Sequence, residues 1–228
     1  MSMPTGIAND KSMPTGIAND KSMPTGSTLE AHRRFLNAYY GTSRHIYDVT
    51  RKYYLFGRDR ALRELAKEPW ETLVEIGPGT GRNLRMLHRA RPEARVGGVE
   101  ASDEMLEHAR VRCPWASLVR GFAESADLAA VHGSPPDRIL FSYCLSMVGE
   151  PRAALDRARQ SLAPRGEVVV VDFADMAGMP AAPRSAFRSW LRAFHVRPLE
   201  AHLIEDRAAR VSYGPMRYYA IARFAAQG

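Results

Sequence analysis

The stretch that decides the fold is Val74-Glu75-Ile76-Gly77-Pro78-Gly79-Thr80-Gly81. A short apolar run ends in a cluster of glycines, and a run with helical spacing follows from residue 82. Glycines at such a junction allow the backbone to turn tightly and to approach a ligand, while the helix N-terminus presents unpaired N–H groups. The stretch therefore predicts a ligand-binding loop between a strand and a helix, with a plain strand-to-helix turn as the alternative.

The next predicted strand indicates what kind of ligand this is. It ends in Gly98-Val99-Glu100, which places a carboxylate 19 residues after Gly81. An acid at that place can accept two hydrogen bonds from a ribose diol. The alternative for Glu100 is a solvated helix cap before Ser102.

Strands and helices alternate along the chain on both sides of the loop. Strands are predicted at 72–76, 95–100, 117–120, 138–141 and 167–173, and helices at 29–40, 45–66, 82–90, 104–112 and 151–162. This alternation predicts an α/β fold with a mostly parallel sheet and helices on both faces. The tail departs from it, because 211–213 and 218–224 are predicted as two adjacent strands joined by Gly214-Pro215, an antiparallel pair at an edge.

The composition limits the class of protein. The chain has 228 residues, of which 45% are hydrophobic and 25% charged, enough for one globular domain. Its most apolar stretch, 168–171, is far too short to span a bilayer, and the start lacks the layout of a secretory signal. Cys113 and Cys144 have no Cys-x-x-Cys spacing, so we expect no disulfide framework, no metal site and a cytoplasmic location.

Charge and repeats add two further expectations. The net charge of +7 suggests an anionic partner without choosing among nucleic acid, a lipid surface and an acidic small molecule. The first residues repeat a polar ten-residue unit, at 2–11, 12–21 and in truncated form at 22–26. We predict a tag-like flexible segment over 1–27, a helical lid over 28–68 and a ligand-binding core over 69–228.

From about residue 44 to the C-terminus, the chain resembles the class I S-adenosylmethionine-dependent methyltransferases. The matching positions follow the predicted strands; they are Glu75, Gly77, Pro78, Gly79 and Gly81 in the loop, then Glu100, Ala101, Ser102 and Met105, then Phe122-Ala123-Glu124, Ser142-Tyr143-Cys144-Leu145-Ser146 and Leu162-Ala163-Pro164-Arg165-Gly166. The resemblance implies a single Rossmann-like seven-stranded domain with an antiparallel C-terminal edge strand, and S-adenosylmethionine as cofactor. It also implies the residues that bind that cofactor: Glu75, Gly77, Pro78, Gly79, Gly81, Glu100, Ala101, Met105, Ala123, Glu124 and Ser142. Ala101, Ser102 and Met105 stand where the family packs the adenine, and 122–124 where it closes over the adenine edge.

Two segments bear on the acceptor. Members that methylate nucleobases or glutamine often carry an Asn-Pro-Pro-Tyr type motif after the fourth strand, and this chain has Ser142-Tyr143-Cys144-Leu145 instead. The segment 44–59 is similar to the entry helix of the bacterial N-methyltransferase that converts diacylglyceryl-homoserine into its trimethyl betaine lipid. That resemblance implies a lipid amine substrate and an upstream lipid-synthesis enzyme as a partner.

The same entry segment has the residues of a lid. Tyr47 and Tyr54 are two helical turns apart and can shield the cofactor from water, and Arg51 between them can pair with its carboxylate. Arg58 is the other candidate for that carboxylate. A surface helix with solvated arginines is the alternative to a lid.

Catalysis of methyl transfer depends mainly on alignment, so few catalytic groups are expected. Tyr143, at the mouth of the site, is the candidate that orients the amine. His45 is the candidate proton acceptor, although a lone histidine on such a helix is more often structural. Asp172, at the end of the fifth strand, either faces the substrate or caps a turn.

Residues 184–195 form a predicted amphipathic helix. Phe187, Trp190, Leu191 and Phe194 make one apolar stripe, which arginines flank at four-residue spacing. Such a helix is typical of contact with an anionic membrane surface, here the inner face of the membrane, and equally of ordinary packing on a sheet.

We therefore expect an S-adenosylmethionine-dependent N-methyltransferase of a lipid head group. The alternative is a soluble methyltransferase of a quinone or secondary metabolite. A non-enzymatic RNA-associated module is the third hypothesis, and we expect no nucleic-acid partner, because no groove pattern of aromatic and basic residues is present.

Overall fold

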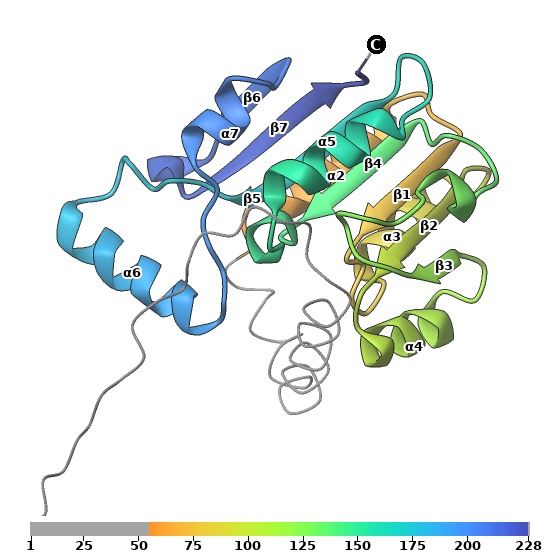
Figure 1. The fold of residues 1–228 in the computed structure, drawn as a ribbon, viewed down its shortest axis with the longest axis horizontal. Coiled ribbons are helices and arrows are strands. Elements are labelled where there is room, and N and C mark those ends of the chain that lie inside the picture. The colour runs from red at the N-terminus through yellow and green to blue at the C-terminus, as the bar shows by residue number, and fades with distance from the viewer. Residues whose placement is uncertain (1–54, 228) are drawn as a thin grey trace, which may run out of the picture.

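A computed structural model describes residues 55–227, which contain a central seven-stranded sheet (Figure 1). The strand order is β3-β2-β1-β4-β5-β7-β6. Five strands are parallel: β1 (Thr72–Ile76), β2 (Arg95–Glu100), β3 (Ser117–Arg120), β4 (Arg138–Ser142) and β5 (Glu167–Phe173). The predicted parallel sheet is thereby confirmed.

The antiparallel tail contains the last two strands. β7 (Tyr219–Ala225) pairs antiparallel with β5, and β6 (Arg210–Tyr213) pairs antiparallel with β7. The predicted antiparallel pair at an edge is confirmed, and the structure shows which of its two strands is outermost. The shorter β6 is the edge strand, and the longer, more buried β7 lies between it and β5.

Six helices cover the sheet or project from it in the described part of the chain. They are α2 (Arg58–Lys67), α3 (Arg82–Ala90), α4 (Asp103–Arg112), α5 (Pro151–Gln160), α6 (Ala181–Ala193) and α7 (Ala201–Glu205). Single 3-10 turns lie at Ala129–Val131, Leu145–Met147 and Pro215–Arg217. In Figure 1, α6 stands at the side of the molecule, away from the strands.

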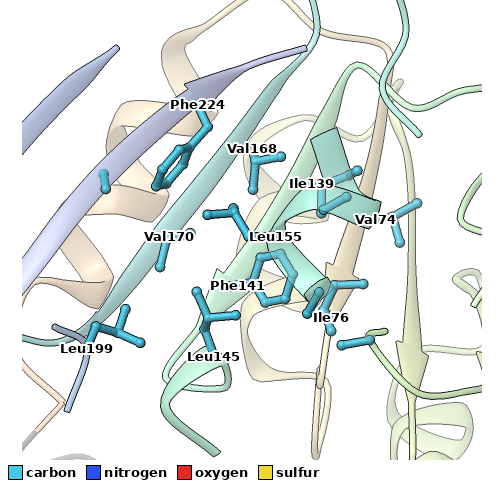
Figure 2. Close-up of a cluster of buried hydrophobic side chains, with 14 of the residues drawn as sticks. Val74, Ile76, Ile139, Phe141, Leu145, Leu155, Val168, Val170, Leu199 and Phe224 are labelled. Atoms are coloured by element: carbon cyan, nitrogen blue, oxygen red, sulfur yellow. The ribbon is translucent and has the colours of Figure 1, made fainter. Parts of the chain in front are cut away.

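The two faces of the sheet bury separate apolar clusters. On one face, Val74, Phe141 and Val170 pack with Leu155 of α5, as Figure 2 shows. On the other face, Leu73 and Val169 pack with leucines of α2 and α3. Because both faces are covered, strands such as β1 are buried along their whole length rather than on alternate residues.

The helix predicted over 45–66 is wrong across residues 55–57. The chain turns at Gly57, whose φ of 79° is left-handed, and α2 begins at Arg58. A Cβ at Gly57 would lie 2.2 Å from the ring of Tyr219, so this conformation and this close approach both require glycine. The predicted helix over 29–40 and the portion 45–54 lie outside the described residues.

The expected lid over 28–68 includes α2, a helix that packs on the sheet. Leu62 and Leu65 of α2 are fully buried with strand and α3 residues, as their spacing predicts. The part of the lid that the structure describes therefore packs as core. The segment 1–27 lies outside the described residues.

Candidate active site

A cavity of about 480 Å³ opens at the carboxyl ends of β1, β2, β3 and β4. The connections reverse direction between β1 and β4, and open parallel sheets bind ligands at such a switch point. The lining residues come from the four loops that follow these strands and from the start of α2. Strand order therefore assigns one end of the cavity to the loop after β3 and the other end to the loop after β4.

The glycine loop forms the wall after β1. Gly77, Pro78 and Gly79 line the cavity, and the φ values of Gly77 and Gly79 are 65° and 55°. A Cβ at Gly77 would lie 2.6 Å from Cys144 Sγ, whereas the position of a Cβ at Gly79 faces open space. The loop thus presents bare backbone to the cavity, as the sequence predicts.

Gly81 is placed differently from the other glycines of the loop. It does not line the cavity; it is the N-cap of α3, and a Cβ there would lie 2.6 Å from Cys113 Sγ at the end of α4. The structure thus gives Gly81 a role in close packing between two helices, and its expected role in ligand binding stays a prediction.

Glu100 is buried at the end of β2, with 6% of its surface exposed, and it lines the cavity. Its two carboxylate oxygens accept hydrogen bonds from the backbone N–H groups of Gly79 and Ser102, both at 3.0 Å. The alternative of a solvated cap is excluded, because the Ser102 hydroxyl itself caps α4. A carboxylate can accept about four hydrogen bonds, so a ligand hydroxyl can share this acceptor with the backbone.

Glu75 and Asn83 form a buried polar pair at the centre of the cavity wall. The Asn83 amide donates to Glu75 Oε1 at 2.6 Å. Burial raises the pKa of Glu75 to about 8, against the opposing effects of the Asn83 hydrogen bond and the positive charge of Arg58. Sequence reasoning missed Asn83; its signal is an amide in the first turn of the helix after the glycine loop.

Three buried oxygens in this wall have no hydrogen-bond partner among the described residues. They are Glu75 Oε2, Asn83 Oδ1 and Ser142 Oγ, all on residues that line the cavity. Buried polar groups without partners are costly; Asn83 Oδ1 only accepts hydrogen bonds, and Glu75 Oε2 only accepts them once the carboxyl is ionised, a form that a cation beside it favours. The arrangement therefore fits a ligand ammonium group.

Arg58 supplies positive charge to the same cavity. It lines the wall at the start of α2, is 9% exposed, and lies 3.6 Å from Asp59. A guanidinium there fits a ligand carboxylate. The competing candidate, Arg51, lies outside the described residues, as do His45, Tyr47 and Tyr54.

The far end of the cavity contains the residues expected around an adenine. Ala101 and Met105 follow β2, and Ala123 and Glu124 follow β3, and all four line the cavity. Next to them lies Phe122, whose ring adds an aromatic wall. The structure therefore brings together the predicted positions after β2 and β3, on one side of the glycine loop.

Tyr143 lines the opposite end, directly after β4. Its hydroxyl donates a hydrogen bond to the backbone carbonyl of Phe56, and its ring packs edge-on against Phe173 at 4.8 Å. Burial raises the pKa of the phenol. The proton is therefore directed at Phe56, and only the oxygen lone pairs are available to a ligand.

Asp172 serves the backbone instead of the cavity. It is fully buried and accepts hydrogen bonds from the N–H groups of Ser146 and Phe173 at 2.9 and 2.8 Å. Of the two expectations for Asp172, the structure therefore supports the one in which it fixes a turn, here the loop after β4.

Comparison with known proteins identifies the fold family. Residues 47–209 match the family model described as a methyltransferase domain. This chain belongs to that family. The match includes the glycine loop, Glu100 and every strand of the parallel sheet.

The chain also has curated relatives. It is 31% identical over 156 residues to the demethylmenaquinone methyltransferase of Tropheryma whipplei, which covers 68% of this chain and 62% of the relative. It is 34% identical over 98 residues to the trans-aconitate 2-methyltransferase of Paracidovorax citrulli, covering 43% and 37%. The chain thus spans between about a third and two thirds of the length of these relatives.

Solved structures support the fold. A Haloferax volcanii methyltransferase, solved with its Trm112 activator, superposes with a TM-score of 0.64 at 16% identity, covering 84% of this chain and 97% of that one. The plantazolicin methyltransferase BamL, solved in complex with SAH, gives 0.57 at 14% identity over 78% and 71%.

S-adenosylmethionine is the cofactor that the methyltransferase cavity fits. Glu100 would bind its ribose, Phe122 and Met105 its adenine, and Arg58 its carboxylate. The three buried oxygens at Glu75, Asn83 and Ser142 match its ammonium group. The bare glycine backbone leaves room for the chain that joins these parts.

Proposed function

We propose that this chain is an S-adenosylmethionine-dependent methyltransferase that acts on an apolar small molecule of the quinone type. The observation that carries the acceptor class is the composition of the cavity end after β4. Leu55, Tyr143 and Met147 line that end, and all three belong to or pack against one apolar cluster. A flat apolar ring fits such walls better than a charged or strongly hydrated acceptor does.

The protein contributes alignment and exclusion of water. When bound, S-adenosylmethionine supplies an electrophilic methyl group. Leu55 and Met147 would position the acceptor and keep water from its nucleophilic atom. The Tyr143 hydroxyl donates its proton to the Phe56 carbonyl, so its oxygen can accept a hydrogen bond from the acceptor molecule. The relatives named demethylmenaquinone methyltransferase and ubiquinone/menaquinone C-methyltransferase support this class.

A lipid amine is the second candidate acceptor, in the form of diacylglyceryl-homoserine made by an upstream enzyme. The observation that favours it is the exposed aromatic and arginine-rich helix α6, described below. The relatives named above do not include a lipid N-methyltransferase, so we rank it below the quinone.

Transfer of a labelled methyl group tests the proposal. The purified chain is incubated with methyl-labelled S-adenosylmethionine and, separately, with a short-chain naphthoquinol, trans-aconitate and diacylglyceryl-homoserine. We expect label in the naphthoquinol. Label in the amine alone would replace the proposal with the second candidate, and intact cofactor binding without transfer to any of the three would overturn both.

A variant pair tests the assigned end of the cavity. Met147→Gln places a polar group among the apolar walls, so we expect turnover of the accepted substrate to fall about tenfold with cofactor affinity unchanged. Met86→Gln is the matched control, because Met86 of α3 is partly buried like Met147 but does not line the cavity. Equal effects of the two changes would contradict the assignment.

A further inference from the structure

Helix α6 has one side chain that is fully buried against the rest of the molecule. That side chain is Leu191, which is 1% exposed. Phe187 is partly buried and lies 6.3 Å from Phe173, ring to ring. The structure therefore divides the apolar stripe expected from the sequence: one half of it is core, and the other half is not.

Trp190 and Phe194 form the other half. They are 42% and 40% exposed, and their rings lie 4.9 Å apart, with Phe187 stacked on Trp190 at 5.4 Å. Phe56, 57% exposed, joins the same aromatic series through Tyr218. We call Phe56, Trp190 and Phe194 the aromatic patch.

The segment 176–199, which contains α6, carries charge of one sign; Asp175, which precedes it, pairs with Arg217. No Asp or Glu occurs from 176 to 199, whereas arginines occur at 184, 188, 192 and 197. Within the described residues, none of these four arginines forms a salt bridge; Arg188 and Arg192 donate only to carbonyl and hydroxyl oxygens. On the helix, Trp190 and Arg192 flank opposite sides of an exposed ridge of small residues: Ala182, Ser185, Ala186, Ser189 and Ala193.

We propose that α6 and the aromatic patch dock on an anionic lipid bilayer. Small residues on the ridge allow the helix to approach a flat surface closely. The aromatic rings would then enter the interfacial region on one side, while the arginines meet lipid phosphates on the other. A second copy of this chain fits less well, because a symmetric contact would oppose one arginine set to the other.

The patch is connected to the cavity. The backbone carbonyl of Phe56 accepts the hydrogen bond of Tyr143, and Leu55, the preceding residue, lines the cavity. Docking would therefore place the acceptor end of the cavity beside the lipid surface. The docking itself does not depend on which acceptor is methylated.

Co-sedimentation of the full chain with vesicles tests the proposal. Binding is compared for phosphatidylcholine vesicles and for an equal mixture of phosphatidylcholine and phosphatidylglycerol. We expect binding to the anionic vesicles only, fading with added salt. Trp190→Ser/Phe194→Ser should weaken it about tenfold or more, since each large ring contributes through burial.

Matched controls separate this effect from a general one. Trp115 is 40% exposed and stacks on His88 at 3.9 Å, outside α6 and the aromatic patch, so Trp115→Ser should leave binding unchanged. Arg188→Glu/Arg192→Glu should weaken binding strongly, whereas Arg152→Glu/Arg165→Glu changes the net charge equally and should weaken it much less. Thermal melting and cofactor affinity of each variant show that it is folded, and the arginine pair tests the surface even if the aromatic pair unfolds.

Three outcomes would overturn the proposal. The first is unchanged vesicle binding by both folded α6 variants. The second is an equal loss in the α6 variants and their controls. The third is that single-stranded RNA displaces the vesicles and that the α6 variants also lose RNA binding. That result would assign this surface to nucleic acid. Loss of methyl transfer with intact vesicle binding concerns the proposed function and leaves docking in place.

Discussion

Glu75 shows how strongly the fold can change the chemistry of one side chain. It is 1% exposed, and burial raises its pKa to about 8 although an amide donates to it. The unfolded chain would have the ordinary carboxyl pKa near 4.5. Between these two values the folded protein holds a proton that the unfolded chain has released.

The contribution of Glu75 to the stability of the cofactor-free protein should therefore fall as the pH rises from about 4.5 to about 8, whereas burial lowers the pKa of His132 and so acts in the opposite direction. The stabilisation that Glu75 contributes is fully present below the unfolded pKa and is lost as the pH passes the folded pKa. For one proton, the free energy of unfolding changes by at most about 1.4 kcal/mol per pH unit. Urea denaturation across this range measures it. Glu75→Gln should flatten the curve and the exposed control Glu107→Gln should not; parallel curves for all three proteins would refute the assignment.

Glu100 is the second residue with a testable role. Its two oxygens hold the backbone of Gly79 and Ser102 and face the cavity. Glu100→Ala should weaken S-adenosylmethionine binding by roughly 1–3 kcal/mol, because the ligand hydroxyls lose a charged acceptor. Calorimetry measures this loss, with Glu107→Ala as control. Unchanged affinity in Glu100→Ala would remove the ribose assignment.

At the scale of elements, one arginine joins the end of a helix to two strands. Arg223 of β7 donates to both carboxylate oxygens of Glu68, at 3.0 and 2.6 Å, and to Glu167 of β5 at 2.6 Å. Glu68 is the C-cap residue of α2. The network thus holds α2, whose first residues line the cavity, against the sheet.

Arg223→Met should lower the free energy of unfolding by about 2–4 kcal/mol. It removes this partner from the partly buried Glu167 and leaves Glu68 with Arg138 at 3.5 Å, and removing one partner of a buried pair is strongly destabilising. Urea denaturation measures the loss, with exposed Arg152→Met as control. Adding Glu68→Gln and Glu167→Gln to the variant should recover part of it; no recovery would show that the lost packing, and not the charge, was decisive.

At the scale of the whole molecule, the cavity is made by loops from four strands and by the start of α2. A ligand there binds only when the sheet and α2 are assembled, so its binding energy adds to the stability of the entire core. No helix in the described part is long and apolar enough to cross a membrane.

Saturating S-adenosylmethionine or its demethylated product should therefore raise the melting temperature of the whole domain in one transition. At a ligand concentration 100 times its Kd, the gain is about 2.7 kcal/mol, which corresponds to a shift of several degrees. Scanning calorimetry measures it. Glu100→Ala should shift less at the same concentration, and a ligand-independent first transition would indicate that α2 or the tail unfolds separately.

The sequence alone determined the alternation of strands and helices, the glycine loop and the position of Glu100. These features are local: apolar periodicity, glycine at a turn and the spacing between consecutive strand ends are all written within short segments. Such signals also located the antiparallel pair at the edge, because Gly214-Pro215 interrupts it, and they placed most cavity residues correctly.

Only the tertiary structure decided what depends on contacts between distant segments. The helix break at Gly57 is fixed by the ring of Tyr219, and the hydroxyl of Tyr143 is directed by the carbonyl of Phe56, neither of which any local pattern specifies. Gly81 packs against Cys113, and Leu191 is core while Trp190 is exposed on the same helix. The physical reason is that a period in the sequence shows which side chains share a face, whereas only the packed neighbours determine how much of that face is covered.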